Sequence, residues 1–212
     1  MFKYKRLPKD EEVKLSINSI DKGHHEVTYN GVKAIKCPFD YVIYQMILHE
    51  VMPDLVIEIG TNIGGGTLYI ADMLNNIGHG IIHTIDINDL ADPKVRMHER
   101  ITIFSDGWEN YDLEITRKFE KILIIEDSSH TYKNTLNVLN KFHPIVSKDS
   151  YFVVEDGIVN ALGWEKEFEG GPLRAIREFL PKNTNYTVDR KWCDMFGKNA
   201  TFNVNGYLKK VN

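Results

Sequence analysis

The sequence predicts an α/β fold with a mostly parallel sheet and helices on both faces of it. Five short apolar segments recur along the chain, segments with helical periodicity separate several of them, and a glycine-rich turn follows the first. Strands that are apolar throughout are typical of parallel sheets covered on both faces, and intervening helices supply the connections that such sheets need. The length of 212 residues fits one domain of this kind.

The first part of the chain is expected to form a short extension before the sheet. Residues 1–35 are polar and irregular except for EVTYNGVKAI, in which Asn30-Gly31 is a favourable dipeptide for a hairpin turn. Residues 39–50 carry apolar side chains at helical spacing and stop before Pro53, which predicts a helix. We therefore expect an N-terminal extension at 1–35 and one main domain at 36–212.

The main domain is expected to alternate between strands and helices. The segment LVIEI (55–59) is the first predicted strand, and the turn GTNIGGG leads from it into a helix. The further expected elements are helices at 67–76, 131–146 and 172–180 and strands at 81–85, 101–104, 122–125 and 151–154. The segments NYTVDR and NGYLKKV near the end predict an antiparallel pair of strands.

Composition and charge exclude several classes of protein. The net charge is −4 and the lysines and arginines are scattered, so we expect no nucleic-acid partner. No apolar run approaches the roughly 18 residues of a membrane span, and MFKYKRLPKDEEVK lacks the apolar region of a signal peptide. Cys37 and Cys193 are too few for a disulfide framework or a zinc cluster. These features favour a cytoplasmic protein; homo-oligomerisation is left open.

Acidic residues stand where two of the apolar strands end. ILII runs into Glu126 and Asp127, and YFVV runs into Glu155 and Asp156. Ligands bind beyond the carboxyl ends of parallel strands, so these acids are expected to face a binding crevice. Acids at strand ends are also found solvated or capping the next helix, and that alternative stays open here.

The glycine-rich turn predicts the cofactor. Gly60 permits a tight turn, while Asn62 replaces a glycine of the dinucleotide fingerprint and no Walker lysine follows. Glu58 would repel a pyrophosphate but suits an ammonium group. Asp86 and Asp106, after the second and third strands, are placed for a ribose and an adenine amino group. The pattern favours S-adenosylmethionine; helix–sheet packing alone is the alternative. The predicted cofactor-binding residues are Glu58, Gly60, Thr61, Asn62, Gly64, Gly65, Asp86, Asp106 and Gly107.

Several of these segments together resemble a known family. IEIGTNIGGGTLYIADML, TIDIND, EDSSH and VVEDG, in this order, resemble the cephalosporin hydroxylase family, which is similar to the metal-dependent sugar O-methyltransferases of macrolide biosynthesis and to rhamnosyl O-methyltransferases. The resemblance covers most of 30–211. Asn88, where many relatives have an acid, and the segment SDG (105–107) depart from the family pattern.

The resemblance implies a Rossmann-like class I methyltransferase fold with a magnesium ion beside the cofactor. It implies Asp127, Glu155 and Asp156 as metal ligands and His130 as the general base. Converging carboxylates repel each other, and a hard divalent cation removes that cost. Glu155 and Asp156 are neighbours, so both reach one ion only if the strand ends there, which Gly157 would allow.

The expected function is magnesium-dependent O-methyl transfer from S-adenosylmethionine to a hydroxyl of a sugar, glycoside or diol-bearing small molecule. Trp108, Tyr132 and Trp164 are expected on loops at the same end of the sheet, where they are candidates for contact with this acceptor, or for packing. Two rival functions remain open. A non-haem iron oxygenase would need two histidines and one carboxylate, and a non-catalytic binding protein would have no need of the acids.

Overall fold

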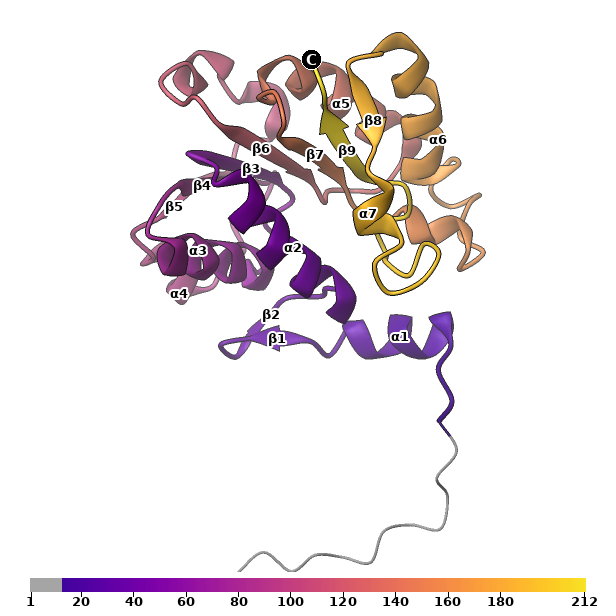
Figure 1. Ribbon diagram of the computed structural model, residues 1–212. Helices are drawn as coiled ribbons and strands as arrows, with labels where there is room; N and C mark the ends of the chain where they lie inside the picture. Colours follow the sequence, from indigo (N-terminus) through magenta and orange to yellow (C-terminus); the bar gives the residue numbers. More distant parts are fainter. Residues whose placement is uncertain (1–12) are drawn as a thin grey trace, which may run out of the picture.

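A seven-stranded sheet with the order β5-β4-β3-β6-β7-β9-β8 forms the centre of the computed structural model, which describes residues 13–212 (Figure 1). The parallel strands are β3 (Leu55–Ile59), β4 (Ile81–Ile85), β5 (Ile101–Phe104), β6 (Ile122–Glu126) and β7 (Tyr151–Val154). The antiparallel strands β8 (Tyr186–Val188) and β9 (Tyr207–Lys210) complete one edge. The predicted parallel strands and the C-terminal antiparallel pair are confirmed.

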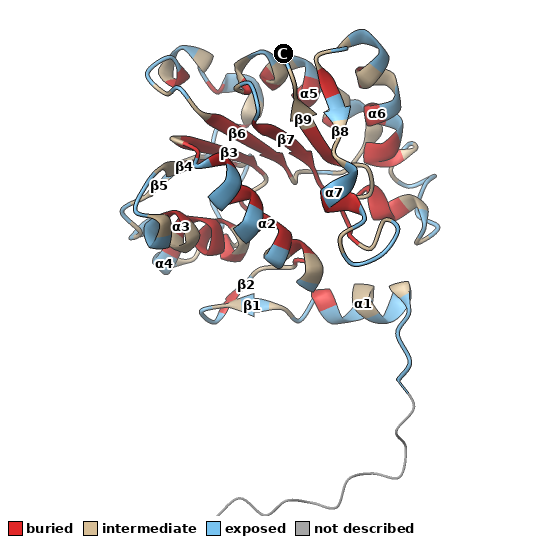
Figure 2. Ribbon diagram, in the orientation of Figure 1, coloured by how far each residue is buried: buried red, intermediate tan, exposed pale blue. Residues whose placement is uncertain are grey.

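Helices cover both faces of this sheet. The helices α2 (Pro38–Val51) and α3 (Gly65–Ile77) pack on one face, and α5 (Tyr132–Phe142) and α6 (Gly171–Phe179) pack on the other (Figure 1). Successive strand residues point to opposite faces, so Val56 joins the first cluster while Leu55 and Ile57 join the second. Figure 2 shows the resulting buried strands between the two layers.

The segment before α2 packs against α3. The predicted hairpin is formed by β1 (Thr28–Tyr29) and β2 (Val32–Lys33), with Asn30 and Gly31 at φ values of 51° and 80°. The ring of Tyr29 meets that of Tyr69 on α3 at a centroid distance of 5.3 Å. The first twelve residues of the predicted extension lie outside the described residues, and the division at residue 35 stays a prediction.

Three short helices were not anticipated, and one predicted helix is shorter than expected. The helices α1 (Ile17–His24), α4 (Pro93–Arg96) and α7 (Arg190–Cys193) are too short to give a clear period in the sequence. The helix expected at 131–146 ends at Phe142, because Pro144 has no N–H to continue the ladder, and a 3-10 turn follows. Single 3-10 turns occupy Trp108–Asn110, Leu113–Thr116, His143–Ile145, Gly157–Asn160 and Leu180–Lys182.

Within residues 13–212, none of the helices combines the length and the apolar character that crossing a membrane requires.

Candidate active site

Four neighbouring strands end in register at one edge of the sheet. Ile59 pairs with both Ile85 and Glu126, and Glu126 pairs with Val154. The residues that follow, Gly60, Asp86, Asp127 and Glu155, therefore leave the sheet side by side. A cleft of about 560 Å³ opens at this edge, a volume typical of small-molecule sites.

The glycine turn lies in the wall of this cleft. Gly60 has φ 108°, and a Cβ there would lie 1.9 Å from the carbonyl oxygen of Asp127. Gly65 begins α3, and its Cβ would lie 2.4 Å from the carbonyl oxygen of Lys33, next to the hairpin. These glycines let three backbone segments meet closely. The same turn also faces the cleft, through Gly60, Thr61, Asn62, Gly64 and Gly65.

Glu58 lies at the base of the cleft, on the face of β3 that α3 covers. It is buried, and its Oε2 accepts hydrogen bonds from the hydroxyls of Thr67 and Thr84, the latter at 2.7 Å. Burial raises the pKa of Glu58, while the charge of Lys36 and the two hydroxyls oppose the rise. The threonines hold the carboxylate in place. Both lie in quoted motifs, Thr67 in IEIGTNIGGGTLYIADML and Thr84 in TIDIND, but neither was predicted as a partner of Glu58.

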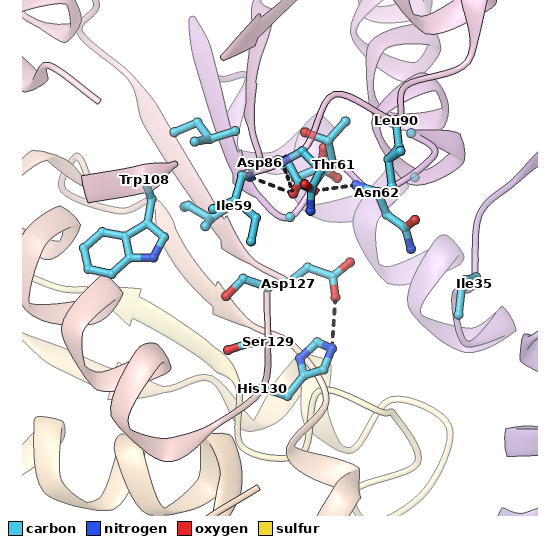
Figure 3. A pocket seen from close by; sticks show the side chains of 18 of the residues that line it. Ile35, Ile59, Thr61, Asn62, Asp86, Leu90, Trp108, Asp127, Ser129 and His130 are labelled. Carbon is cyan, nitrogen blue, oxygen red and sulfur yellow. Dashed lines mark hydrogen bonds and ion pairs between the residues drawn. The ribbon is translucent and has the colours of Figure 1, made fainter. Parts of the chain in front are cut away.

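Asp86 ties the end of β4 to the glycine turn. Its Oδ2 accepts from the N–H of Asn62 at 2.8 Å, and its Oδ1 accepts from the N–H groups of Ile87 and Asn88 at 2.7 and 3.2 Å. Figure 3 shows Asp86 beside Thr61 and Asn62 in the cleft wall. The carboxylate thus has a fixed orientation before any ligand arrives, which suits a residue that receives hydroxyl groups.

The residues after β5 fall into two groups. Asp106 and Gly107 are not among the described residues that line the cleft, although the N–H of Gly107 donates to the carbonyl of Asp86 at 3.0 Å. Trp108 does line it (Figure 3). Its Nε1 donates to Asn134 at 3.1 Å.

Of the other two candidate aromatics, neither reaches the lining formed by the described residues. The Tyr132 hydroxyl donates to Glu178, and its ring lies 3.8 Å from the Arg174 guanidinium. Trp164 is 39% exposed on its own loop. The contacts of Tyr132 are those of a residue that joins α5 to α6.

Asp127, His130 and Asp156 converge at the mouth of the cleft. The Nε2 of His130 lies 3.3 Å from Oδ2 of Asp156 and 4.0 Å from Oδ1 of Asp127. All three offer a ligand atom within 4.8 Å of the others, from the loops after β6 and β7. Asp127 and His130 lie side by side in Figure 3. This arrangement of two carboxylates and an imidazole fits a divalent cation.

Glu155 lies outside that group and pairs with Lys36. The strand β7 ends at Val154, and Asp156 adopts a left-handed conformation with φ 54°, so the neighbouring acids do not alternate as in a strand. The buried Glu155 carboxylate accepts hydrogen bonds at Oε1 from Lys36 Nζ and from the Tyr44 hydroxyl, each at 2.6 Å. Asp127 shares the Lys36 donor, also at 2.6 Å, so the two acids lie close together, and the ligand set of Asp127, Glu155 and Asp156 stays a prediction. Neither Lys36 nor Tyr44 was predicted from the sequence as a site residue.

Charge and burial oppose each other in this region. Burial raises the pKa of Asp127 and of Glu155, and the Lys36 ammonium partly offsets the rise. Burial alone would lower the pKa of His130, but the charges of Asp156 and Asp127 outweigh it and raise that pKa. The backbone of His130 is left-handed, with φ 55°, which turns its ring toward the two aspartates.

Comparisons with known proteins agree with this architecture. The family model described as Rhamnosyl O-methyltransferase/CmcI matches residues 22–211. A rhamnosyl O-methyltransferase of Mycobacterium leprae (strain TN) is 34% identical over 193 residues, which cover 85% of this chain and 82% of that protein.

Two solved structures of CmcI share the fold. The first, described with SAH, has a TM-score of 0.70 and 17% identity, covering 98% of this chain and 96% of the other. The second, described with Mg-SAM, has a TM-score of 0.67 and 20% identity, covering 98% and 88%. The predicted fold class and family resemblance are confirmed. The chain belongs to the Rhamnosyl O-methyltransferase/CmcI family and is an O-methyltransferase with the class I methyltransferase fold.

Proposed function

We propose that this enzyme takes a methyl group from S-adenosylmethionine and transfers it, with magnesium, to a hydroxyl of a sugar, glycoside or diol-bearing small molecule. The observation that carries the proposal is the single cleft in which a glycine turn, a fixed ribose-type carboxylate and an acid–imidazole group meet. The relative from M. leprae is named for a rhamnosyl acceptor, and one CmcI structure is described with Mg-SAM, which supports both parts of the proposal.

The cofactor would lie along the glycine turn. S-adenosylmethionine supplies an electrophilic methyl group bound to a positively charged sulfur. Asp86 would accept hydrogen bonds from the ribose hydroxyls, and Glu58 would attract the ammonium of the methionine part. Trp108 offers an apolar face in the cleft for the adenine or for the acceptor. Asp106 and Gly107 remain predicted contacts of the cofactor, although they are not among the described residues that line the cleft.

Asp127 and Asp156 are the residues that would hold magnesium, with His130 beside them as the base and Glu155, directly after β7, as the predicted third ligand. When bound, this ion would orient the acceptor hydroxyl and lower its pKa. The role of His130 in this proposal is to accept the hydroxyl proton at Nε2, the nitrogen that faces the two aspartates. An iron oxygenase is disfavoured, because the group supplies one histidine where such a site uses two.

The buried free cysteines Cys37 and Cys193 suit a reducing compartment, and we place the enzyme in the cytoplasm as part of this proposal.

Methyl transfer can be tested directly with methyl-labelled S-adenosylmethionine and a panel of rhamnosides. We expect labelled product from acceptors with free hydroxyls, none from a fully O-methylated rhamnoside, and loss of turnover in EDTA that magnesium restores. An Asp127→Asn variant should keep cofactor binding and lose the magnesium-dependent rate. Full transfer in EDTA would exclude a catalytic metal, and transfer to none of the hydroxyl acceptors would exclude this acceptor class.

A further inference from the structure

The end of α1 carries a second group of metal-ligating side chains, apart from the catalytic cleft. Asp21, His24 and His25 each offer one ligand atom, and these three atoms lie within 4.8 Å of one another. The spacing explains this, because residues three and four positions apart share one face of a helix, so Asp21 faces both histidines. None of the three is among the described residues that line the cleft, so the group is separate from the proposed site of methyl transfer.

Protein encloses two members of this group. The His24 side chain is only 10% exposed, and its ring meets that of Phe202 edge-on at a centroid distance of 5.0 Å. Its Nδ1 donates to the carbonyl oxygen of Asp21, which leaves the lone pair of Nε2 available in the neutral ring. Oδ1 of Asp21 is buried and accepts no hydrogen bond from the residues that the structure describes. A buried carboxylate oxygen without a partner is costly, and a bound cation would remove that cost.

The donor atoms indicate which class of ion fits. Two imidazoles and one carboxylate suit a transition metal such as Zn²⁺, whereas Mg²⁺ prefers oxygen ligands. Ligands bonded at about 2.0–2.2 Å in a tetrahedral site lie roughly 3.3–3.6 Å apart, so small side-chain rotations from the observed spacing would bring all three to one ion. His25 is exposed, so an ion can enter from solvent and keep a water molecule in its fourth position.

We propose that Asp21, His24 and His25 bind one divalent transition-metal ion of the zinc class, at a site separate from the magnesium site. The same three ligand types hold iron in non-haem oxygenases. Here they lie outside the lining that the described residues give the cleft, so the ion does not meet the substrate and its role is structural.

The ion would fasten α1 to the segment that follows Asp156. Ile20 of α1 packs on the cluster that contains Ile158 and Phe202, and Figure 1 shows α1 beside the loop before β9. The N–H of Ile158, two residues after Asp156, donates to the carbonyl of Phe202 at 3.0 Å. His24 would bind the ion and contact Phe202 at the same time. Zn²⁺ should therefore raise the unfolding temperature of the chain, because it binds the folded state.

The test uses Co²⁺ as the probe, because Co²⁺ replaces Zn²⁺ in such sites and absorbs visible light when four-coordinate. The full chain is titrated in excess Mg²⁺, which occupies the oxygen ligands of the catalytic group. We expect His25→Gln and Asp21→Asn each to weaken Co²⁺ binding by about tenfold or more. The matched control is His79→Gln, which removes an exposed histidine whose Nε2 lies 2.8 Å from Oδ1 of Asp54. This control should bind Co²⁺ within about twofold of wild type.

Two results would overturn the proposal without touching the proposed methyl transfer. Unchanged Co²⁺ affinity in His25→Gln would show that the histidine is not a ligand, and this exposed residue can be replaced without disturbing the fold. Loss of the Co²⁺ absorption in Asp127→Asn, with its retention in His25→Gln, would place the ion in the catalytic group. Zn²⁺ should also raise the unfolding temperature of wild type and leave that of His25→Gln unchanged; equal shifts in the two proteins would likewise contradict the site.

Discussion

Replacing Gly60 by alanine should be among the most damaging changes available near the cleft. Gly60 has φ 108°, and the added Cβ would stand 1.9 Å from the carbonyl oxygen of Asp127 and 2.6 Å from its carbon. Neither partner can yield easily, because the Gly60 N–H donates to the carbonyl of Ile85 and the Asp127 N–H donates to that of Ile59, both at 2.8 Å. To restore ordinary van der Waals contact, the two strands would have to move apart by roughly 1 Å or more.

Two effects add up in this variant. A non-glycine residue at such a φ costs about 1–3 kcal/mol, and forcing extra atoms into a packed site costs about 1–3 kcal/mol more. We therefore expect Gly60→Ala to lower the free energy of unfolding by about 3–5 kcal/mol. The matched control is Gly78→Ala at the end of α3, where φ is 77° but nothing lies within 4 Å of the added Cβ. The Gly78→Ala control should lose only the free energy that the unfavourable backbone conformation costs.

Urea unfolding followed by circular dichroism gives both free energies, and titration calorimetry gives the affinity for S-adenosylmethionine. Gly60→Ala should also weaken cofactor binding, because the displaced turn carries Thr61 and Asn62 into the cleft wall. Gly78→Ala should bind the cofactor as wild type does. Equal destabilisation of the two variants would refute the reasoning, since it would mean that the close approach of Gly60 to Asp127 carries no energetic cost.

Three further predictions concern single side chains. Asp86→Ala should weaken S-adenosylmethionine binding by about 1.5–3 kcal/mol in calorimetry, whereas Asp89→Ala, which removes a surface partner of Arg96, should not; equal affinities would move the ribose elsewhere. His130→Gln should lose roughly 10²–10⁴-fold in turnover, and wild-type turnover should rise with pH because neutral imidazole is the base; a glutamine variant at full rate would contradict this. Burial lowers the pKa of His83 to about 4. The contribution of the neutral His83 to the free energy of unfolding should therefore be fully present above pH 6.5, and about 3 kcal/mol of it should be lost as the pH falls from 6.5 through that pKa. Urea titrations of His83→Gln should lack this loss, and an unchanged pH profile in that variant would rule the histidine out as its source.

The elements that could be predicted from the sequence are those whose conformation depends on neighbouring residues. Each parallel strand is a short apolar run, and Asn30-Gly31 and the glycine turn carry their own conformational preferences, so these elements could be predicted. Acids directly after neighbouring parallel strands must share an edge, which is why Asp86 and Asp127 could be placed together at the cleft.

What could not be predicted depends on long-range contacts and on single backbone angles. Lys36 lies 91 residues from Asp127 and 119 from Glu155, and nothing in IKCPFD marks it as their partner. The different directions of Glu155 and Asp156 follow from the left-handed backbone of Asp156, which the pattern VVEDG does not specify. The helix α1 depends on a capping box of Ser16 and Ser19, a signal confined to a few polar residues.

The position of the hairpin segment has a consequence for the order in which the enzyme matures. Lys33, Ala34 and Ile35 form part of the cleft wall, and Lys36 reaches across to the loops after β6 and β7. During synthesis this segment emerges early, yet its partners emerge more than 90 residues later. Contacts of such separation form late, because the chain between them must first be closed into a loop. A nascent chain interrupted before β7 would hold the glycine turn and the ribose carboxylate but could not close the far side of the site, so the newborn polypeptide gains its ligand-binding capacity only as its last third is made.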